Sequence, residues 1–376
     1  MMIFRLLLFS AAVGGYTYLR VVAPLAWGAR RKAAAAVALG VVALRLPVLE
    51  LLRGDSVYSA ALPPWLNILY SWLFIALLMW FCGVFALTIA GRSVLRAVGA
   101  WRRLSDAAQQ SCCTRLHGLM LAGALCLSAW GTWSGVQPPV LRELSLHGGL
   151  PQPLRVALLT DLHVSTLQEP DTLRRLVERT NALGADVVCI TGDFVDGSVE
   201  ECAERMAVLR ELRAPLGIYG VAGNHDYYSG YDAWRTFLTE HGVRMLDNEH
   251  VLLPNGVVMA GVTEETALKL PGMQPPDLPK ALRGVPSGAR VILLSHRPNV
   301  VQEAAQHGVA VQLSGHTHGG IVWGVGQIVA LMNSGYLVGH YTVGNTQLYI
   351  SGGTGTGSRT PLRIATPAEL TLITID

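Results

Sequence analysis

Polar side chains suited to metal binding and proton transfer follow five short apolar segments in the second half of the sequence. The apolar segment RVALLT, for example, runs directly into Asp161-Leu162-His163. In open α/β sheets, ligands bind in the crevice outside the carboxyl ends of the strands. If the five segments are strands of such a sheet, one set of side chains meets at a common edge. The set contains Asp161, His163, Asp193, Asn224, His225, His296, His316 and His318.

This set combines carboxylate, amide and imidazole groups and contains no thiolate. Such a set is typical of a site for Zn, Mn or Fe. It differs from a structural zinc site, which is built from cysteines, and from a calcium site, which is built from oxygen ligands alone. The seven side chains other than His225 are too many for one ion with an open position, and they suffice for two ions that share one carboxylate. Any one of these motifs is more often a turn, but five in order favour a metal site.

Strands and helices alternate around these motifs. Amphipathic helices are predicted over residues 171–185, 201–212 and 231–242, between apolar segments rich in β-branched residues. Further strands are predicted towards the end of the chain, including QLYISGG and ELTLITI. Strands that alternate with helices and are followed by several more strands indicate an α/β domain of layered sheets.

The first 140 residues differ in composition from the rest of the chain. Charged residues make up 15% of the whole sequence, against about 25% in an ordinary soluble domain. Four apolar stretches lie at roughly 2–22, 33–52, 66–90 and 116–136. Each approaches the ~20 residues with which a helix crosses the hydrocarbon core of a membrane. Four spans are therefore predicted, of which the second contains an arginine, Arg45, and a proline, Pro47.

Basic residues are concentrated in two of the predicted connecting loops. The loops after the first and third spans carry three and five basic residues, whereas the loop after the second carries Arg53 beside Asp55. By the positive-inside rule, the two basic loops face the cytoplasm. The sequence thus predicts a multi-pass protein of the cytoplasmic (inner) membrane, with everything after Val136 outside the cytoplasm.

The balance of charge changes at about the same point. Residues 1–140 contain 12 Lys and Arg against 3 Asp and Glu, whereas residues 141–376 contain 17 against 23. An acidic second half gives no support for nucleic-acid binding, which depends on basic surface. We predict a membrane region over 1–137 in contact with the lipid bilayer, a linker over 138–153 and a soluble domain over 154–376.

The motifs TDLHVS, GDFVDG, GNHDYY, SHRP and SGHTHGG stand in the order typical of the calcineurin-like metallophosphoesterase superfamily. Residues 154–376 resemble its membrane-anchored bacterial branch, including the closing segments YISGGTGTGSRTPLR and ELTLITI. The resemblance implies a four-layer sandwich, in which two mixed sheets are flanked by helices. It also implies a metal-dependent hydrolase that acts on phosphate esters.

The resemblance implies a role for each of the converging side chains. Asp193 would bridge two divalent ions, and His225 would be a catalytic histidine that binds neither. The first ion would be held by Asp161, His163 and His318, and the second by Asn224, His296 and His316. Two such ions, about 3.5–4 Å apart, lower the pKa of a bridging water and present hydroxide to phosphorus.

Three further features have less specific interpretations. Arg359, in the Gly-rich strip SGGTGTGSR, and the nearby Arg363 are candidates for binding a further anionic group of the substrate. Asp226 either orients His225 or stabilises a turn. A Pro-rich insertion over residues 267–286 is either a lid over a lipid substrate or a surface loop.

The predicted function is hydrolysis of a phosphate ester, on a lipid-like or envelope substrate, by a membrane-anchored enzyme with an extracytoplasmic catalytic domain. Two alternatives stay open. In the first, the chain is a pyrophosphatase that cleaves a nucleotide-linked lipid A precursor at the cytoplasmic face. In the second, the spans form a transporter or sensor that a metal-binding domain regulates. Membrane topology distinguishes the first alternative from the predicted function. Metal-dependent hydrolysis distinguishes the second.

Overall fold

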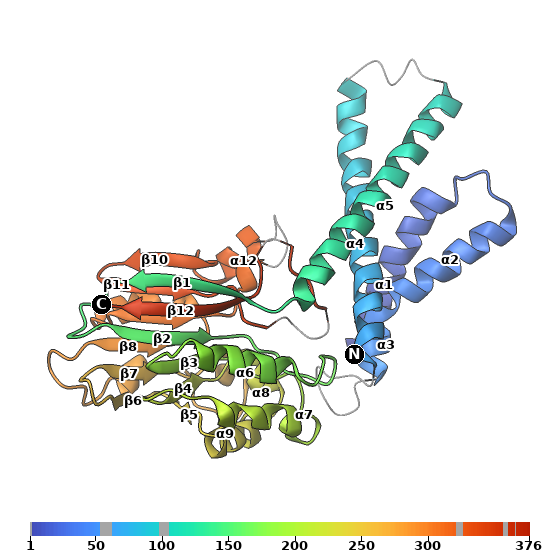
Figure 1. The fold of residues 1–376 in the computed structure, drawn as a ribbon. Coiled ribbons are helices and arrows are strands. Elements are labelled where there is room, and N and C mark those ends of the chain that lie inside the picture. Colours follow the sequence, from blue (N-terminus) through green and yellow to red (C-terminus); the bar gives the residue numbers. More distant parts are fainter. Residues whose placement is uncertain (1, 53–61, 98–104, 321–325, 356–359, 365) are drawn as a thin grey trace. The chain divides into compact units, whose positions relative to one another are not determined.

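The computed structural model describes residues 2–52, 62–97, 105–320, 326–355, 360–364 and 366–376 (Figure 1). The chain divides into two compact units, of which the first ends at Trp133 and the second runs from Ser134 to the last residue. The first unit holds the long apolar helices and the second holds the strands, so each unit is described by itself.

Helices make up the described part of the first unit. They are α1 (Met2–Thr17), continued by the π-helical turn η1 (Tyr18–Val22), α2 (Ala29–Ala43), α3 (Arg45–Leu52), α4 (Pro64–Ala97) and α5 (Asp106–Val136). Three stretches are long and apolar enough to cross a membrane, namely Met2–Val22, Pro64–Ala90 and Ala107–Val136. Helices α2 and α3 pass the same test together but are bent by 48°. The described residues thus contain three candidate spans, or four if the bent pair is one span.

The bend falls within the second predicted span, close to Arg45 and Pro47. Proline lacks the backbone N–H that would bond to the preceding turn, and its ring clashes with that turn. Arg45 is fully buried and donates hydrogen bonds to Asn67 Oδ1 (3.0 Å) and Ser71 Oγ (2.7 Å) of α4. Polar side chains of a neighbouring helix therefore stabilise the charge in this broken span.

Two six-stranded mixed sheets form the second unit. The first sheet has the order β1-β12-β2-β3-β4-β5. Its strands are β1 (Val140–Leu146), β2 (Leu154–Leu159), β3 (Val187–Thr191), β4 (Ile218–Val221), β5 (Arg244–Met245) and β12 (Glu369–Ile375). The second sheet has the order β10-β11-β9-β8-β7-β6. Its strands are β6 (Glu249–Leu252), β7 (Val258–Gly261), β8 (Val291–Leu294), β9 (Val311–Ser314), β10 (Gly339–Val343) and β11 (Thr346–Ile350).

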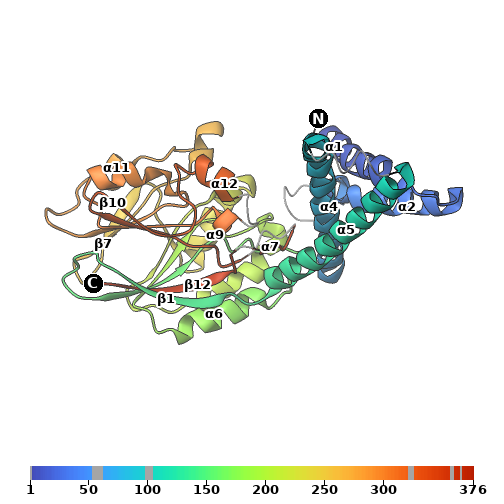
Figure 2. The ribbon, with the colours of Figure 1, turned by 90° about the horizontal axis from the view of Figure 1, so that it is seen from above.

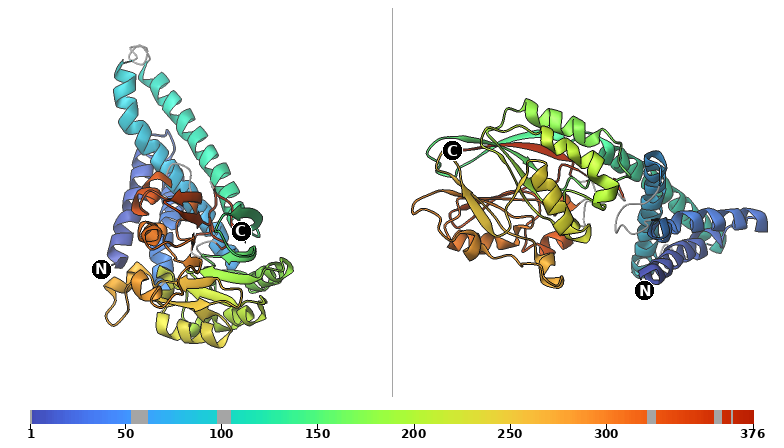
Figure 3. Two further views of the ribbon diagram at one scale, coloured as in Figure 1. Left: turned by 90° about the vertical axis from the view of Figure 1, so that its left-hand side faces the viewer. Right: turned by 90° about the horizontal axis from the view of Figure 1, so that it is seen from below.

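Helices cover the outer face of each sheet, as Figures 2 and 3 show from two sides. The first sheet carries α6 (Thr172–Ala182), α7 (Val199–Met206) and α9 (Tyr231–Glu240). The second carries α10 (Leu278–Ala281) and α11 (Val301–Gln306). The predicted four-layer sandwich, two mixed sheets flanked by helices, is confirmed.

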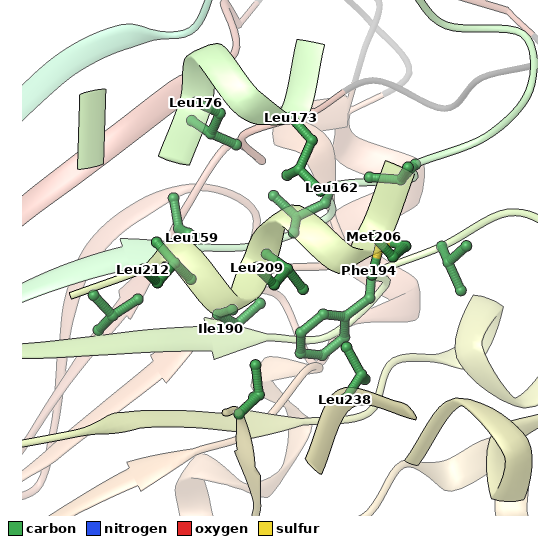
Figure 4. Close-up of a cluster of buried hydrophobic side chains, with 14 of the residues drawn as sticks. Leu159, Leu162, Leu173, Leu176, Ile190, Phe194, Met206, Leu209, Leu212 and Leu238 are labelled. Atoms are coloured by element: carbon green, nitrogen blue, oxygen red, sulfur yellow. The ribbon is translucent and has the colours of Figure 1, made fainter. Parts of the chain in front are cut away.

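Apolar side chains fill the spaces between the layers. Leu173 of α6 and Met206 of α7 belong to the same buried cluster as Ile190 of β3 (Figure 4). Between the two sheets lie fully buried residues such as Val156 of β2 and Ile292 of β8. Every residue of β3 and β8 is buried, which explains why these strands are continuous apolar runs in the sequence.

The segment predicted as a linker, residues 138–153, instead contains the strand β1. It pairs in parallel with β12, from Val140–Glu369 to Leu146–Ile375. Most side chains of this edge strand are exposed, so it lacks the apolar run that marks the buried strands. Its partner strand closes the sequence, and local patterning could not reveal the pairing.

Short helices follow several strands at the edge where the predicted site residues lie. They are α8 (Asn224–Tyr228) after β4, η4 (Glu265–Lys269) after β7, and η6 (His318–Gly320) with α12 (Gly326–Met332) after β9. Strands β2, β3 and β4 run parallel, as do β7, β8 and β9. The ends of these six strands, and the segments that follow them, form what we call the carboxyl edge.

Candidate metal centre

The predicted ligands lie where the chain leaves the strands in an unusual backbone conformation. Five of them have positive φ angles: Asp161 (53°), His163 (47°), Asp193 (51°), His316 (70°) and His318 (49°). Positive φ is uncommon for residues other than glycine and is concentrated at functional sites. It turns the chain sharply at the carboxyl edge and brings the ligand atoms of Asp161, His163 and His318 within 4.8 Å of one another.

The first group of candidate ligands consists of Asp161, His163 and His318. The Nε2 atom of His318 lies 3.3 Å from Asp161 Oδ1 and 3.1 Å from His163 Nε2. The Asp161 carboxylate also accepts hydrogen bonds from Thr160 Oγ1 (2.7 Å) and from the backbone N–H of His316 (3.1 Å). One carboxylate and two imidazoles that converge in this way fit a divalent transition metal.

The second group consists of Asn224, His296 and His316. The Nε2 atom of His296 lies 3.3 Å from Asn224 Oδ1 and 3.1 Å from His316 Nδ1. On the other side of the ring, His296 Nδ1 lies 2.8 Å from the carbonyl oxygen of Thr191. A hydrogen bond at that position fixes the orientation of a ligating imidazole.

Asp193 lies between the two groups. Its Oδ2 atom is 3.6 Å from His163 Nε2 and 3.4 Å from His296 Nε2. Its Oδ1 atom accepts a hydrogen bond from the backbone N–H of His225 (2.8 Å). One oxygen of Asp193 therefore faces ligand atoms of both groups, and the seven side chains together fit two ions with a shared carboxylate.

His225 lies beside these groups, with its ring against another carboxylate. Its Nδ1 atom is 2.6 Å from Asp196 Oδ1, and the same oxygen is 3.0 Å from His163 Nδ1. The side chain of His225 is 23% exposed, whereas that of His163 is 2% exposed. Of these two histidines, His225 is the one that a substrate can reach from solvent.

Comparisons with known proteins identify the family. Residues 154–320 match the family described as Calcineurin-like phosphoesterase. A transmembrane protein with metallophosphoesterase domain from Danio rerio is 32% identical over 332 residues, which cover 83% of this chain and 74% of that protein. The chain belongs to the calcineurin-like phosphoesterase family.

Bacterial phosphoesterases are similar over a shorter part of the chain. An uncharacterized metallophosphoesterase of Helicobacter pylori strain J99 is 35% identical over 243 residues, or 64% of this chain, and the chain spans 65% of its length. An uncharacterized metallophosphoesterase of Aquifex aeolicus is 32% identical over 59% of this chain and 85% of that protein. The predicted resemblance is confirmed. The apolar helices and the transmembrane relative also indicate a membrane protein.

Carboxylates of the phosphoesterase domain raise the proton affinity of two candidate ligands. Burial by itself lowers the pKa of His163, but the surrounding carboxylates, Asp196 foremost, raise it to about 9. Burial also lowers the pKa of His296, and the carboxylates, Asp193 foremost, raise it to about 10. The carboxylates thus stabilise positive charge at these two imidazoles, and they would stabilise divalent ions in the same way.

Arg363, predicted to bind substrate, is fully buried behind the candidate ligand His318. Its Nη2 atom lies 3.1 Å from His318 Nδ1, and its guanidinium donates hydrogen bonds to the backbone carbonyls of Gly352 and Gly355. Burial lowers the pKa of His318 well below its usual range, and the charge of Arg363 lowers it further. Contact between Arg363 and substrate stays a prediction, and Arg359 lies outside the described residues.

Two charged side chains at the site are absent from the sequence-based set. Asp196 is the second aspartate of GDFVDG, three residues after Asp193, and that repeated carboxylate is the signal that could have identified it. Arg297 follows His296 directly, and its guanidinium contacts the Glu264 carboxylate and lies 3.5 Å from Asn224 Oδ1. No pattern in the sequence distinguishes Arg297 from a surface arginine.

Asp226 stabilises the turn that carries Asn224 and His225. Its carboxylate accepts hydrogen bonds from the backbone N–H groups of Gly223 (2.8 Å) and Phe194 (2.9 Å). Burial raises the pKa of this carboxyl to about 7. Of the two predicted roles, these contacts favour the turn.

The Pro-rich insertion after β7 is only partly available to a substrate. Leu270 and Met273 are partly buried and pack against the core between the first sheet and its helices. Leu268, on η4, is 70% exposed. The insertion therefore offers one strongly exposed side chain among these three apolar residues.

Proposed function

We propose that the chain is a membrane-anchored phosphoesterase that uses two divalent ions to hydrolyse phosphate esters carried by lipids or other components of the cell envelope. The observation that carries the proposal is the position of Asp193, whose Oδ2 atom faces His163 on one side and His296 on the other. Two-metal sites are the common solution for hydrolysing phosphate esters. Membership of the calcineurin-like phosphoesterase family supports the same reaction.

The residues of the two groups would hold the ions, and Asp193 would be shared between them. The donor set fits Mn, Fe or Zn. When bound, such ions lower the pKa of water and stabilise negative charge on phosphoryl oxygens. The chain fixes the orientation of two ligating rings. The Asp196 carboxylate contacts Nδ1 of His163, and the carbonyl oxygen of Thr191 contacts Nδ1 of His296.

His225 is the residue that we assign to proton transfer. Asp196 accepts the hydrogen bond at His225 Nδ1 (2.6 Å), so Nε2 is the atom that donates to substrate when the ring is protonated. A proton given from Nε2 to the leaving alkoxide would contribute the roughly 10²–10⁴-fold that is typical of general acid catalysis. The partial exposure of the His225 side chain leaves room for a substrate oxygen.

The short connection to the membrane supports a membrane-borne substrate. Helix α5 ends at Val136 and β1 begins at Val140, so three residues separate a candidate span from the phosphoesterase domain. The basic residues of the loops after the first and third predicted spans favour an orientation in which this domain lies outside the cytoplasm. The proposed substrates are therefore phosphate esters of the outer leaflet or envelope.

Hydrolysis by the full chain in detergent tests the proposal. Lipid phosphates, lipid pyrophosphates and nucleotide esters would each be supplied with Mn, Fe, Zn and Mg in turn. We expect metal-dependent hydrolysis of a lipid phosphate that is lost in His225→Ala and kept in the exposed control His340→Ala. Hydrolysis of nucleotide-linked pyrophosphates alone would favour the cytoplasmic-face alternative, and no hydrolysis with any metal would contradict the proposal.

A further inference from the structure

Three exposed apolar side chains lie on one face of α12. Ile328, Leu331 and Met332 are 60%, 80% and 73% exposed, and their spacing of three and four residues places them side by side on a helix. Exposed apolar side chains gathered in this way mark surfaces that bind a membrane or another molecule. The surrounding sequence is also uncharged, because no Asp, Glu, Lys or Arg occurs between Glu303 and Arg359.

Helix α12 begins beside the candidate metal centre. The preceding turn, η6, starts with the candidate ligand His318. The backbones of Gly320 and Gly326 lie so close that a Cβ atom on Gly320 would come within 2.5 Å of Gly326 Cα. Glycine at position 320 therefore allows α12 to start directly against η6, which places this helix on the carboxyl edge.

A fourth exposed apolar side chain belongs to the same edge. Leu268 lies on η4, which follows the carboxyl end of β7. We call these four residues the apolar rim: Leu268, Ile328, Leu331 and Met332. By contrast, Leu252 lies at the opposite edge, because it pairs with Val258 at the start of β7. Its side chain is 51% exposed.

The chain enters this unit from the membrane at the carboxyl edge as well. Val140 at the start of β1 pairs with Glu369 at the start of β12, and Thr371 of β12 pairs with Leu158 near the end of β2. The start of β1 and α12 therefore lie at the same end of the sheets (Figure 1). Four Cα–Cα steps join α5 to β1, which limits their separation to about 15 Å.

We propose that the apolar rim inserts into the surface of the bilayer that holds α5, so that the carboxyl edge rests at the level of the lipid head groups. A lipid bilayer is the occupant that these observations favour, because the tether and the rim share one edge and the rim helix carries no charge. This proposal rests on the proposed function only in taking the substrate to be a phosphate ester carried by a lipid. It explains how a site at this edge would reach a phosphate that stays in the membrane.

Fluorescence quenching by lipids tests the insertion without any use of activity. The full chain would be placed, one copy per disc, in nanodiscs of phosphatidylcholine and phosphatidylglycerol. Cys82, Cys112, Cys113 and Cys126 would be replaced by alanine, which leaves the buried Cys189 and Cys202. A nitrobenzoxadiazole fluorophore would then be attached at Leu331→Cys or, as the matched control, at Leu252→Cys.

Acyl chains that carry bromine should quench the fluorophore at Leu331→Cys by about twofold and leave the fluorophore at Leu252→Cys unchanged. Equal emission from Leu331→Cys in brominated and ordinary lipids would overturn the proposal. So would equal quenching at both positions, because the domain would then have no preferred edge. Protection of Leu331→Cys from a water-soluble maleimide only at high protein concentration in detergent would assign the face to a second copy of the chain, and would also overturn it.

A kinetic measurement separates the rim from the chemistry. The triple variant Ile328→Ser, Leu331→Ser, Met332→Ser should raise KM for a lipid phosphate in vesicles by about tenfold and leave hydrolysis of a soluble ester unchanged. The control Leu252→Ser should change neither. If the chain hydrolyses neither ester but is quenched at Leu331→Cys, the proposed function is contradicted and insertion of the rim is supported. If the chain hydrolyses the esters but is not quenched, the proposed function is supported and insertion of the rim is contradicted.

Discussion

The Oδ1 atom of Asp196 lies 2.6 Å from Nδ1 of His225. The same oxygen lies 3.0 Å from Nδ1 of His163, a candidate metal ligand. One buried carboxylate thus orients both the histidine assigned to proton transfer and a histidine assigned to metal binding. Because Asp196 acts through these two imidazoles, we assign it as a positioning residue.

Replacing this carboxylate should impair turnover more than substrate binding. In Asp196→Asn, the two imidazoles lose their anionic acceptor, so we expect kcat to fall by about 10²-fold with KM within about twofold. Metal analysis should show weaker binding in the first group, where His163 lies. The exposed Asp232→Asn is the matched control, and an unchanged kcat in Asp196→Asn would refute the positioning role.

Metal affinity should increase with pH. The pKa of metal-free His163 is raised to about 9 and that of His296 to about 10, so both imidazoles are protonated at neutral pH. A ligating imidazole must give up its proton. We therefore expect Kd for Mn or Zn to fall by about tenfold per pH unit for each displaced proton, from pH 6.5 towards pH 9.

Calorimetry in two buffers of different ionisation enthalpy checks the same prediction directly. It should detect protons released to the buffer when the metal binds. Metal binding with a pH-independent Kd and no proton release would contradict the raised pKa values of these two histidines.

Arg363 should contribute to the stability of the domain. Arg363→Met removes the donor to the carbonyls of Gly352 and Gly355, and each buried acceptor left without a partner costs about 1–3 kcal/mol. The midpoint of thermal unfolding should fall by about 2–4 °C for each kcal/mol lost. The exposed Arg174→Met should leave the midpoint unchanged. A normal midpoint with a raised KM would instead identify Arg363 as a substrate-binding residue.

Most of the sandwich follows from local sequence, because its central strands are buried on both faces. Strands such as β3 and β8 are continuous apolar runs, and the amphipathic helix α6 shows its apolar stripe directly. The edge strand β1 escapes prediction because its side chains are exposed and its partner, β12, lies at the other end of the domain's sequence. Local patterning carries no information about such a pairing.

The candidate ligands could be predicted because each directly follows a buried strand. Asp196 could not be assigned in the same way, since its role depends on the meeting of His163 and His225 in space. The environment of Arg363 could not be predicted either, because it depends on backbone carbonyls of the irregular segment that follows β11. Sequence therefore predicts which residues line the carboxyl edge better than which contacts support them.

Membrane topology should place the phosphoesterase domain outside the cytoplasm. Alkaline phosphatase, active only outside, and a fluorescent protein that matures only in the cytoplasm would each be fused after Gln110 and after Asp376. The loop charges predict fluorescence at Gln110 and phosphatase activity at Asp376. The reverse pattern would exclude the exported orientation and favour the cytoplasmic pyrophosphatase.

The number of metal ions bound by the purified full chain shows whether Asp193 is shared between two ions and whether His225 binds neither. Elemental analysis should find two ions per chain in the unaltered protein and in His225→Ala, which should nevertheless lose about 10²–10⁴-fold in kcat. Asp193→Ala should lose both ions, because its Oδ2 atom faces both groups. Two ions retained in Asp193→Ala, or ions lost in His225→Ala, would contradict these roles of Asp193 and His225.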